Sequence, residues 1–347
     1  MRKFLAALLA LALTISAACA MELPYPAETV LSVRPLTEAQ RSLVETLYGP
    51  VFNQAEKISL PAGTLYADVS AAMNCLMQDY PELFHLGRDY TIGYYRDTPE
   101  YAAWVEPQYR MSAEEAAAAR AALYARAYLL ADASPDALSL HDRLCDLAVY
   151  GGGTELRHTA VGALLEGQAT CEGYAQALTL LCRMAGIPCG VITGTAVDDA
   201  GVSERHAWCI ADVDGYTLID PTWNDQDALG LNTHWYYGLS TGQMAADHTP
   251  DEGQSIPLCD THANWHDRNG LVVTDQESAD AAIRRLVAGE TVNLRTSDRT
   301  MYAALTDDLA ARLEHYNQRH PDAAFYGTYS LVKCDAQMCI ILQALRP

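Results

Sequence analysis

The run CEGYAQALTLLCRMAG (171–186) most constrains how this chain can fold. Its pattern is that of a helix with apolar residues on most faces, and Gly186 and Pro188 end it. A helix that is apolar all round has to be covered on several sides by other elements. We therefore predict that this helix lies buried inside a domain.

Three predicted strands follow the helix, in the segments 190–194, 206–213 and 216–220. The connection over 213–215 decides how the last two strands align. A two-residue turn would place His206 and Asp220 on opposite faces of the sheet. A three-residue loop with Gly215 left-handed pairs residue 212 with residue 216 and places both on one face. We predict the three-residue loop, or a bulge that gives the same alignment.

Helices and strands are predicted on both sides of this segment, so the fold class is α+β. An Ala-rich helix over 111–133 begins with Ser112 and Glu115 in a capping box, and YTIGYY (90–95) is extended. The predicted tail comprises a strand at 271–275, a helix at 276–288, a strand at 291–296, a helix at 302–319 and a hairpin at 326–344. We divide the chain into an N-terminal α+β region (21–110), a middle domain (111–255), for which the residues discussed below predict a catalytic role, and a small C-terminal α+β domain (256–347).

Residues 1–20 have the features of a signal peptide. Arg2 and Lys3 precede an apolar run, and small residues end at Ala20. We expect cleavage after Ala20 and a secreted or extracytoplasmic protein. The alternative is a lipid anchor on Cys19, although Ser16 stands where such sites normally carry a larger aliphatic residue.

The charge of the chain excludes some partners. Its 23 Lys and Arg residues against 44 Asp and Glu residues give a net charge of −21. Nucleic acid and anionic membrane surfaces are therefore poor partners. No later apolar stretch is long enough to form a transmembrane segment, because charged residues interrupt each one. The sequence predicts no metal and no cofactor, and it leaves the oligomeric state open.

The cysteine count suits an exported protein. Of ten cysteines, nine remain without Cys19. If Cys171 is a free nucleophile, the other eight can form up to four disulfides. Cys334 and Cys339 are the predicted local pair, because they flank a short turn over 335–338.

Three residues form the candidate catalytic set. Cys171 opens the buried helix, with Thr170 placed to cap it, and the positive end of a helix dipole favours a reactive thiolate. Glu172 opposes that effect, so a histidine partner is needed. His206 is the expected partner, and Asp220 would orient its ring.

The segment around these residues resembles the transglutaminase-like superfamily. The similar stretches are GQATCEGYAQALTLLCRMAGIPCGVITG (167–194), HAW (206–208) and DGYTLIDPTWND (214–225). Weaker similarity lies in YPELFHL (80–86), HWYYGLS (234–240) and DHTPDE (247–252). The resemblance implies a papain-like core, in which a helix carrying the cysteine packs on an antiparallel sheet carrying His and Asp. It also implies that Cys171, His206 and Asp220 take the catalytic positions.

Four further residues are candidates near this set. The backbone N–H of Cys171 would meet the oxyanion, and Gln168 is a candidate second donor by analogy with glutamines that precede other catalytic cysteines. Tyr174, Trp208 and Trp223 are candidates for lining a substrate groove, and the two tryptophans are also candidates for simple packing.

The sequence thus predicts an exported cysteine enzyme that acts on protein or peptide substrates through a thioester. Hydrolysis is the favoured outcome, because selection of an amine over water requires a dedicated tunnel. Two alternatives stay open. One is a protein-glutamine transamidase that forms cross-links, and the other is a binding or scaffold protein with an idle site.

Overall fold

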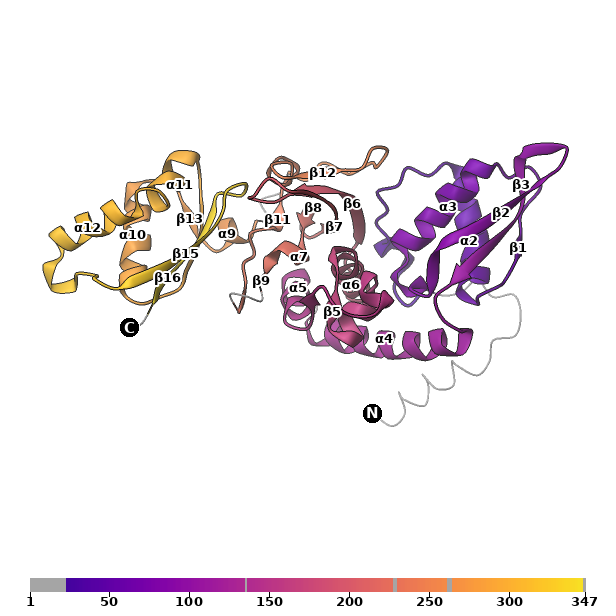
Figure 1. The fold of residues 1–347 in the computed structure, drawn as a ribbon, viewed down its shortest axis with the longest axis horizontal. Coiled ribbons are helices and arrows are strands. Elements are labelled where there is room, and N and C mark those ends of the chain that lie inside the picture. The colour runs from indigo at the N-terminus through magenta and orange to yellow at the C-terminus, as the bar shows by residue number, and fades with distance from the viewer. Residues whose placement is uncertain (1–22, 135, 227–229, 261–263, 346–347) are drawn as a thin grey trace.

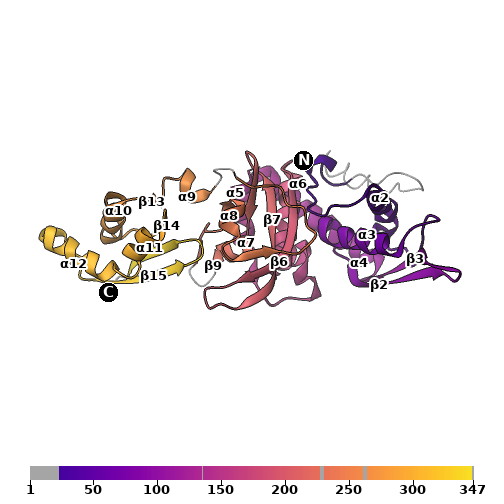
Figure 2. The same ribbon diagram turned by 90° about the horizontal axis from the view of Figure 1, so that it is seen from above.

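The structure is a computed structural model, and it describes residues 23–134, 136–226, 230–260 and 264–345. The predicted signal peptide and Cys19 lie outside the described residues. Three bodies follow one another along an elongated molecule, in chain order from one end to the other (Figures 1 and 2). Within the described ranges, no helix has both the length and the apolar character needed to cross a membrane.

The N-terminal region combines two helices with a three-stranded sheet of order β1-β3-β2. Its elements are η1 (Ala27–Thr29), α2 (Glu38–Phe52), β1 (Ile58–Ser59), α3 (Tyr66–Asp79), η2 (Pro81–Leu83), β2 (Leu86–Tyr95) and β3 (Thr98–Tyr109). The segment 90–95 lies in β2, as its Tyr-rich pattern predicts. Leu47, Met73 and Val105 lie in the core between the helices and the sheet.

The middle body is built on a five-stranded sheet of order β11-β8-β7-β6-β12. Its strands are β6 (Cys189–Val197), β7 (Ser203–Asp212), β8 (Tyr216–Ile219), β11 (Tyr237–Leu239) and β12 (His248–Pro250). The predicted central helix is α6 (Cys171–Met184), and it packs against β6 and β7 as well as α4 (Ala113–Ala133) and α5 (Ala137–Cys145). Its residues from 173 to 183 are all buried, which confirms the prediction of a covered helix.

Short elements complete this body. They are β4 (Val149–Tyr150), η3 (Glu155–His158), η4 (Gly162–Glu166), β5 (Gln168–Ala169), α7 (Pro221–Asn224), β9 (Asp225–Gln226), β10 (Leu231–Asn232) and α8 (Thr241–Met244). The predicted capping box of Ser112 and Glu115 is present at the start of α4. These findings agree with the predicted α+β class.

The connection between β7 and β8 has the predicted length. Asp212 pairs with Tyr216, so residues 213–215 form a three-residue loop. Asp214 has a φ of 56° and Gly215 a φ of 103°, and both values lie in the region that favours glycine and asparagine or aspartate. The resulting alignment places His206 and Asp220 on one face of the sheet, so this prediction is confirmed.

The C-terminal domain has a four-stranded sheet of order β13-β14-β16-β15. Its elements are α9 (Trp265–Arg268), β13 (Val272–Val273), α10 (Gln276–Val287), β14 (Val292–Thr296), α11 (Arg299–Leu305), α12 (Leu309–Arg319), η6 (Pro321–Ala323), β15 (Thr328–Cys334) and β16 (Cys339–Leu345). The helix predicted over 302–319 is two helices. They are separated at Asp307 and Asp308, a residue type that favours helix ends over helix interiors.

Contacts cross both predicted domain boundaries. Val33, from the N-terminal region, is fully buried in a hydrophobic cluster with Trp208 of β7. Cys334, Cys339 and Ile341 of the C-terminal hairpin belong to the same cluster. The central sheet is therefore packed by residues from both ends of the chain.

All nine cysteines in the described part of the chain are free thiols. Cys334 and Cys339 face each other across the β15–β16 hairpin, as the spacing predicts, but they are not bonded. Cys171 is partly exposed, whereas the other eight are buried.

Candidate active site

Cys171 is the first residue of α6, so its backbone N–H is among those that the helix itself cannot satisfy. Thr170 is the N-cap residue, but its hydroxyl makes no capping hydrogen bond. The hydroxyl lies 2.9 Å from Nδ1 of His158 instead. The prediction that Thr170 caps this helix with its side chain is therefore wrong, because η3 competes for the hydroxyl.

The carboxylate of Asp220 holds the ring of His206 on one buried face of the central sheet. Nε2 of His206 lies 2.8 Å from Oδ2 of Asp220, and both side chains are buried. Cys171 lies close enough to this ring to raise its pKa, and the two residues line one cavity. Since Nε2 faces the carboxylate, Nδ1 is the nitrogen left for the thiol. The structure thus brings the three residues of the candidate set together.

Charges around His206 keep its ring protonated. Burial alone would lower its pKa, but the charge and hydrogen bond of Asp220 and the contact with Cys171 raise the pKa of His206 to about 10. Burial would raise the pKa of Asp220, yet the cationic His206 and the neighbouring His248 hold it well below its usual range. The pair is therefore an imidazolium and a carboxylate at neutral pH.

Both oxygens of Asp220 are fully used. Oδ1 accepts from the backbone N–H groups of Thr222 at 2.9 Å and Trp223 at 3.2 Å, since Asp220 is the N-cap of α7. Oδ2 faces His206 and also Nε2 of His248, at 3.2 Å. These contacts fix the carboxylate on every side and leave it no freedom to rotate.

His248 is a residue that the sequence analysis did not identify as part of the site. It lies in β12, at the edge of the sheet beside β6, and its Nδ1 is 2.6 Å from Oδ1 of Asp247. Its only signal in the sequence was the segment 247–252, which carries weak family similarity. The register of β7 and β8 could not predict the contact between His248 and Asp220, because these two residues are 28 positions apart in the chain.

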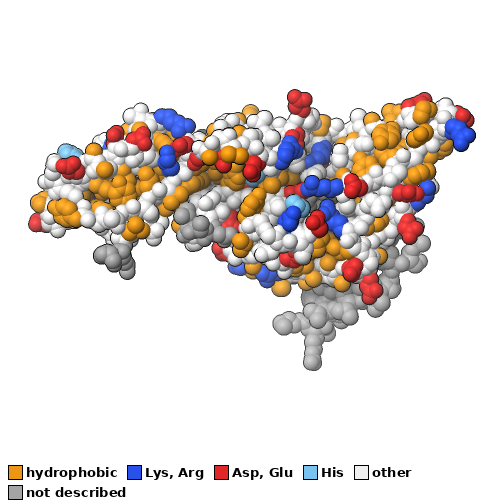
Figure 3. Space-filling view, in the orientation of Figure 1, with side chains coloured by type: hydrophobic (Ala, Val, Ile, Leu, Met, Phe, Trp, Pro, Cys, Tyr) orange, Lys and Arg blue, Asp and Glu red, His pale blue; other side chains and the backbone are white. Residues whose placement is uncertain are grey.

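A cavity of about 390 Å³ opens beside Cys171 and His206. Its wall comes from both the middle body and the N-terminal region, since the lining includes Gln176, Thr193, Asn74, Tyr80, Phe84 and Arg110. Figure 3 shows Lys and Arg side chains gathered around a histidine where these two bodies meet. The predicted catalytic domain therefore supplies only part of the cavity that surrounds its own cysteine.

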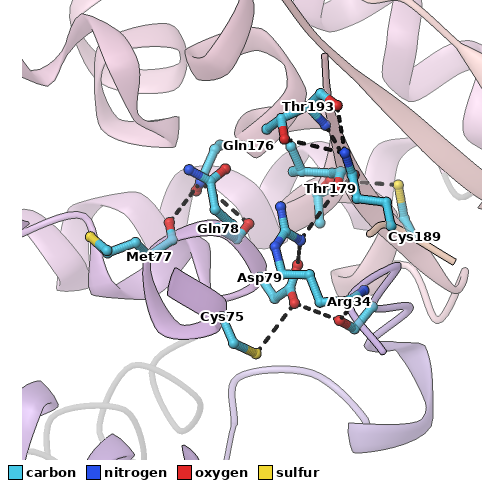
Figure 4. Close-up of polar contacts among 12 residues, drawn as sticks. Arg34, Cys75, Met77, Gln78, Asp79, Gln176, Thr179, Cys189 and Thr193 are labelled. Carbon is cyan, nitrogen blue, oxygen red and sulfur yellow. Dashed lines mark hydrogen bonds and ion pairs between the residues drawn. The ribbon is translucent and has the colours of Figure 1, made fainter. Parts of the chain in front are cut away.

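Direct contacts hold the N-terminal region against α6 (Figure 4). Nε2 of Gln176 donates to the backbone oxygen of Met77 at 3.1 Å. Asp79, at the end of α3, pairs with Arg34, and its backbone oxygen accepts from the fully buried Arg183. Nε2 of Gln78 lies 3.4 Å from Oε1 of Glu172, the residue after the cysteine. These bonds fix the cavity wall in place.

Two of the three groove candidates are core residues. Tyr174 is fully buried, and its hydroxyl contacts the backbone oxygen of Ala148, at 2.8 Å, and the carboxylate of Asp225. Trp208 is 1% exposed, and its ring lies under His206 and against His248. Their predicted role in lining a groove is therefore corrected to packing. Both side chains point into the core because the helix and the sheet are covered on those faces.

Trp223 and Gln168 also lie away from the cavity beside Cys171. Trp223 packs on His206 with ring centroids 5.3 Å apart and lines a second cavity of about 370 Å³, next to the C-terminal hairpin. Gln168 is exposed, and its side chain lies against Gly152 and Gly153. The wall of the cysteine cavity includes neither residue.

Within the part of the chain that the structure describes, two groups of side chains bring possible metal ligands together, namely His206, Asp220 and His248, and His141, Asp142 and His234. In the second group, Nε2 of His141 accepts from the amide of Asn224, whose oxygen is occupied by the backbone N–H of Tyr236. The proton of His141 is therefore on Nδ1, where it donates to Asp142. Hydrogen bonds thus account for this cluster, and we assign no cofactor to either group.

Residues 129–221 match the model of the transglutaminase-like superfamily. No curated protein matches the chain. Among the solved structures that match, two show partial similarity. A putative cysteine protease from Cytophaga hutchinsonii has 17% identity and a TM-score of 0.26, over 42% of this chain and 64% of that one. A TGase has 12% identity and a TM-score of 0.26, over 62% of this chain and 55% of that one. The matched parts span less than two thirds of either protein, and at these values neither structure informs the function of this chain.

Proposed function

We propose that this chain, whose residues 129–221 belong to the transglutaminase-like superfamily, is a cysteine enzyme that transfers acyl groups from amides through a thioester on Cys171. The observation that carries the proposal is the position of the His206 ring, which contacts the thiol of Cys171 and the carboxylate of Asp220 at once. The family match supports the same general kind of activity.

The residues have complementary roles in this reaction. An imidazolium at His206 stabilises a thiolate on Cys171, which attacks the carbonyl carbon of the amide. His206 then gives its proton to the leaving amine, and the C–N bond breaks as the thioester forms. Asp220 holds the ring and its charge throughout. The backbone N–H of Cys171, at the start of α6, is the donor we assign to the oxyanion.

We further propose that water resolves the thioester. Cys171 is partly exposed and lines an open cavity, so water has access to the acyl group. The water oxygen would add to the acyl carbon and give a proton to His206. The C–S bond would then break, which releases the carboxylic acid and restores the thiolate beside the imidazolium. The protein would then be a peptidase or amidase, acting outside the cytoplasm if residues 1–20 are a cleaved signal peptide.

The first test is brief alkylation by iodoacetamide at about pH 6, followed by mass spectrometry. We expect one rapid label on Cys171, because the other described cysteines are buried. The label should be absent in Cys171→Ala and slower in His206→Ala. If Cys171 reacts no faster than a small free thiol, the site is idle and the scaffold alternative replaces the enzyme.

A second test separates the two acyl acceptors. Glutamine-containing peptides are incubated with the protein, with and without a primary amine, and the products are weighed by mass spectrometry. Cleavage or deamidation that the amine does not suppress supports hydrolysis. Incorporation of the amine as the main product would instead identify a transamidase.

A further inference from the structure

The wall of the Cys171 cavity has a different charge from the rest of the molecule. The chain carries a net charge of −21. The cavity lining nevertheless contains three arginines, Arg88, Arg110 and Arg205, against the single carboxylate of Glu172. A fourth arginine, Arg157, lies directly beside His158, which is also in the lining. Arginine side chains are therefore concentrated around the candidate nucleophile of a protein that is acidic as a whole.

Two of these arginines are compensated by carboxylates. Arg88 pairs with Glu172, and Arg205 forms a two-point ion pair with Asp251, with distances of 2.5 and 2.7 Å. The sequence indicated that the negative charge of Glu172 opposes a thiolate on Cys171. The ion pair with Arg88 offsets that charge.

Arg110 and Arg157 are not compensated in this way. Among the described residues, neither guanidinium forms an ion pair with a carboxylate. Arg110 donates to the backbone oxygens of Leu86 at 3.0 Å and Glu155 at 3.4 Å, while Arg157 donates to Nε2 of His158 at 3.3 Å. The backbone bonds hold the guanidinium of Arg110 at the cavity wall without neutralising its charge.

His158 lies among these cations, since it lines the cavity with Arg88 and Arg110 and accepts a hydrogen bond from Arg157. Burial lowers its pKa first, Glu172 works in the opposite direction, and Arg88, Arg157 and Arg110 each lower it further. Nε2 of His158 accepts a hydrogen bond from Arg157, so this nitrogen carries no proton and the ring is neutral, in agreement with its lowered pKa. Arg88 and Arg110 line the cavity together with His158, and Arg157 contacts that ring from outside the lining.

We propose that Arg110, with Arg88 in the same cavity wall, binds an anionic group of the substrate, a carboxylate or a phosphate, next to the amide that Cys171 attacks. A guanidinium matches either oxyanion in geometry and charge. This inference rests on the proposed function, and it assigns the substrate class as an acidic peptide or a phosphopeptide. The local field also draws such a substrate in against the repulsion of the acidic chain.

The test compares two alkylating reagents that differ in charge. Iodoacetate and iodoacetamide both alkylate Cys171, and the ratio of their rates reports the electrostatic potential at the thiol. Relative to glutathione, the wild-type ratio should favour iodoacetate, and added salt should reduce the preference. In Arg110→Gln the ratio should fall about three- to tenfold, as expected for one charge removed at the intermediate dielectric constant near a protein surface.

Two variants serve as controls. Arg110→Lys keeps the charge and should keep the ratio, so a loss in both variants would show a structural effect and overturn the proposal. Arg96→Gln removes an exposed arginine from the turn between β2 and β3, outside the cavity lining, and should leave the ratio unchanged.

Protection of Cys171 by peptides then identifies the anion. Three peptides of equal length are compared as protectors against iodoacetamide, with glutamate, phosphoserine or glutamine beside a central amide. Better protection by the glutamate peptide or by the phosphoserine peptide, lost in Arg110→Gln, supports the proposal and names the group. Equal protection by the glutamine peptide overturns it.

Rapid labelling by iodoacetamide with no charge preference would contradict this inference alone, whereas the absence of rapid labelling by either reagent would contradict the proposed function.

Discussion

Nε2 of His248 lies 3.2 Å from Oδ2 of Asp220, the same oxygen that faces His206. Nδ1 of His248 faces a second carboxylate, that of Asp247. Both ring nitrogens must then donate, so His248 is an imidazolium, and its raised pKa agrees because the two aspartates outweigh the effect of burial. A buried cation thus sits between two buried anions, behind the candidate triad.

Replacing His248 should be costly. In His248→Gln, Asp247 would lose its cationic partner and Asp220 would keep only His206, and we expect the free energy of unfolding to fall by about 3 kcal/mol. Urea denaturation measures the change. As a control, Tyr236→Phe removes a hydroxyl that donates to Asp247 at 2.6 Å and should cost only about 1 kcal/mol. Equal losses in the two variants would contradict the ionic role of His248.

Asp220→Asn should impair both stability and thiol reactivity. One oxygen of Asp220 accepts from two backbone N–H groups and the other faces two histidines, so an amide NH₂ would meet donors in either orientation. We expect alkylation of Cys171 at about pH 6 to slow by at least tenfold and the free energy of unfolding to fall by about 2 kcal/mol.

The matched control for that variant is Asp214→Asn, in the exposed loop between β7 and β8. Asparagine tolerates the positive φ of 56° at this position, so stability and labelling should stay close to wild type. An Asp220→Asn protein that labels at the wild-type rate would remove Asp220 from the proposed triad.

Stability should fall as the pH rises from neutral to alkaline. The pKa of His206 is raised to about 10 in the fold, so its ionic contact stabilises the protein fully below the unfolded value of about 6.5 and is lost as the pH rises through the folded value. His248 acts in the same direction because its pKa is also raised. We expect the free energy of unfolding to decrease across this range.

Denaturation of the wild type and of His206→Gln over the same range isolates the contribution of His206. The decrease should be smaller in the variant. Parallel curves would mean that other groups, such as the buried thiols, cause the whole pH dependence. Toward acid, Asp220 gives the opposite behaviour, because its lowered pKa makes its contribution disappear only as the pH falls well below about 4.

Gly190 should tolerate no side chain. A Cβ at this position would lie 1.7 Å from the backbone oxygen of Leu31, which belongs to the N-terminal segment that packs on the edge of β6. We expect Gly190→Ala to cost more than about 2 kcal/mol or to release that segment. Thermal denaturation and limited proteolysis near residue 31 detect these two outcomes.

Gly242→Ala is the counterpart within α8. Apart from its chain neighbours and the helix backbone, nothing lies within 4 Å of a Cβ at Gly242, so this change should stabilise the protein by about 0.5–1 kcal/mol. A Gly190→Ala protein as stable as wild type would mean that the N-terminal segment does not need its contact with β6.

Local chemistry was enough to predict much of the fold. The buried helix followed from the apolar residues on most faces of 171–186, and the start of α4 from Ser112 and Glu115. The alignment of His206 with Asp220 followed from the length of one loop. Each of these features depends on a few consecutive residues, and the sequence carries such information directly.

Long-range packing decided the rest. The periodicity of α6 does not show that Tyr174 points into the core toward Ala148 and Asp225, since that helix has apolar residues on most faces. The sequence around Cys171 could not predict the contact of His248 with Asp220. That contact forms because β12 adds to the edge of the sheet beside β6. The arginines of the cavity wall come from β2, from the residue after β3 and from β7, so they form one charged surface only after the N-terminal region docks on α6. The sequence by itself determined the candidate nucleophile and its partners, because these follow from local pattern and family motif. The tertiary structure alone decided the surroundings of the nucleophile, because contacts between residues far apart in the chain depend on how separate elements pack.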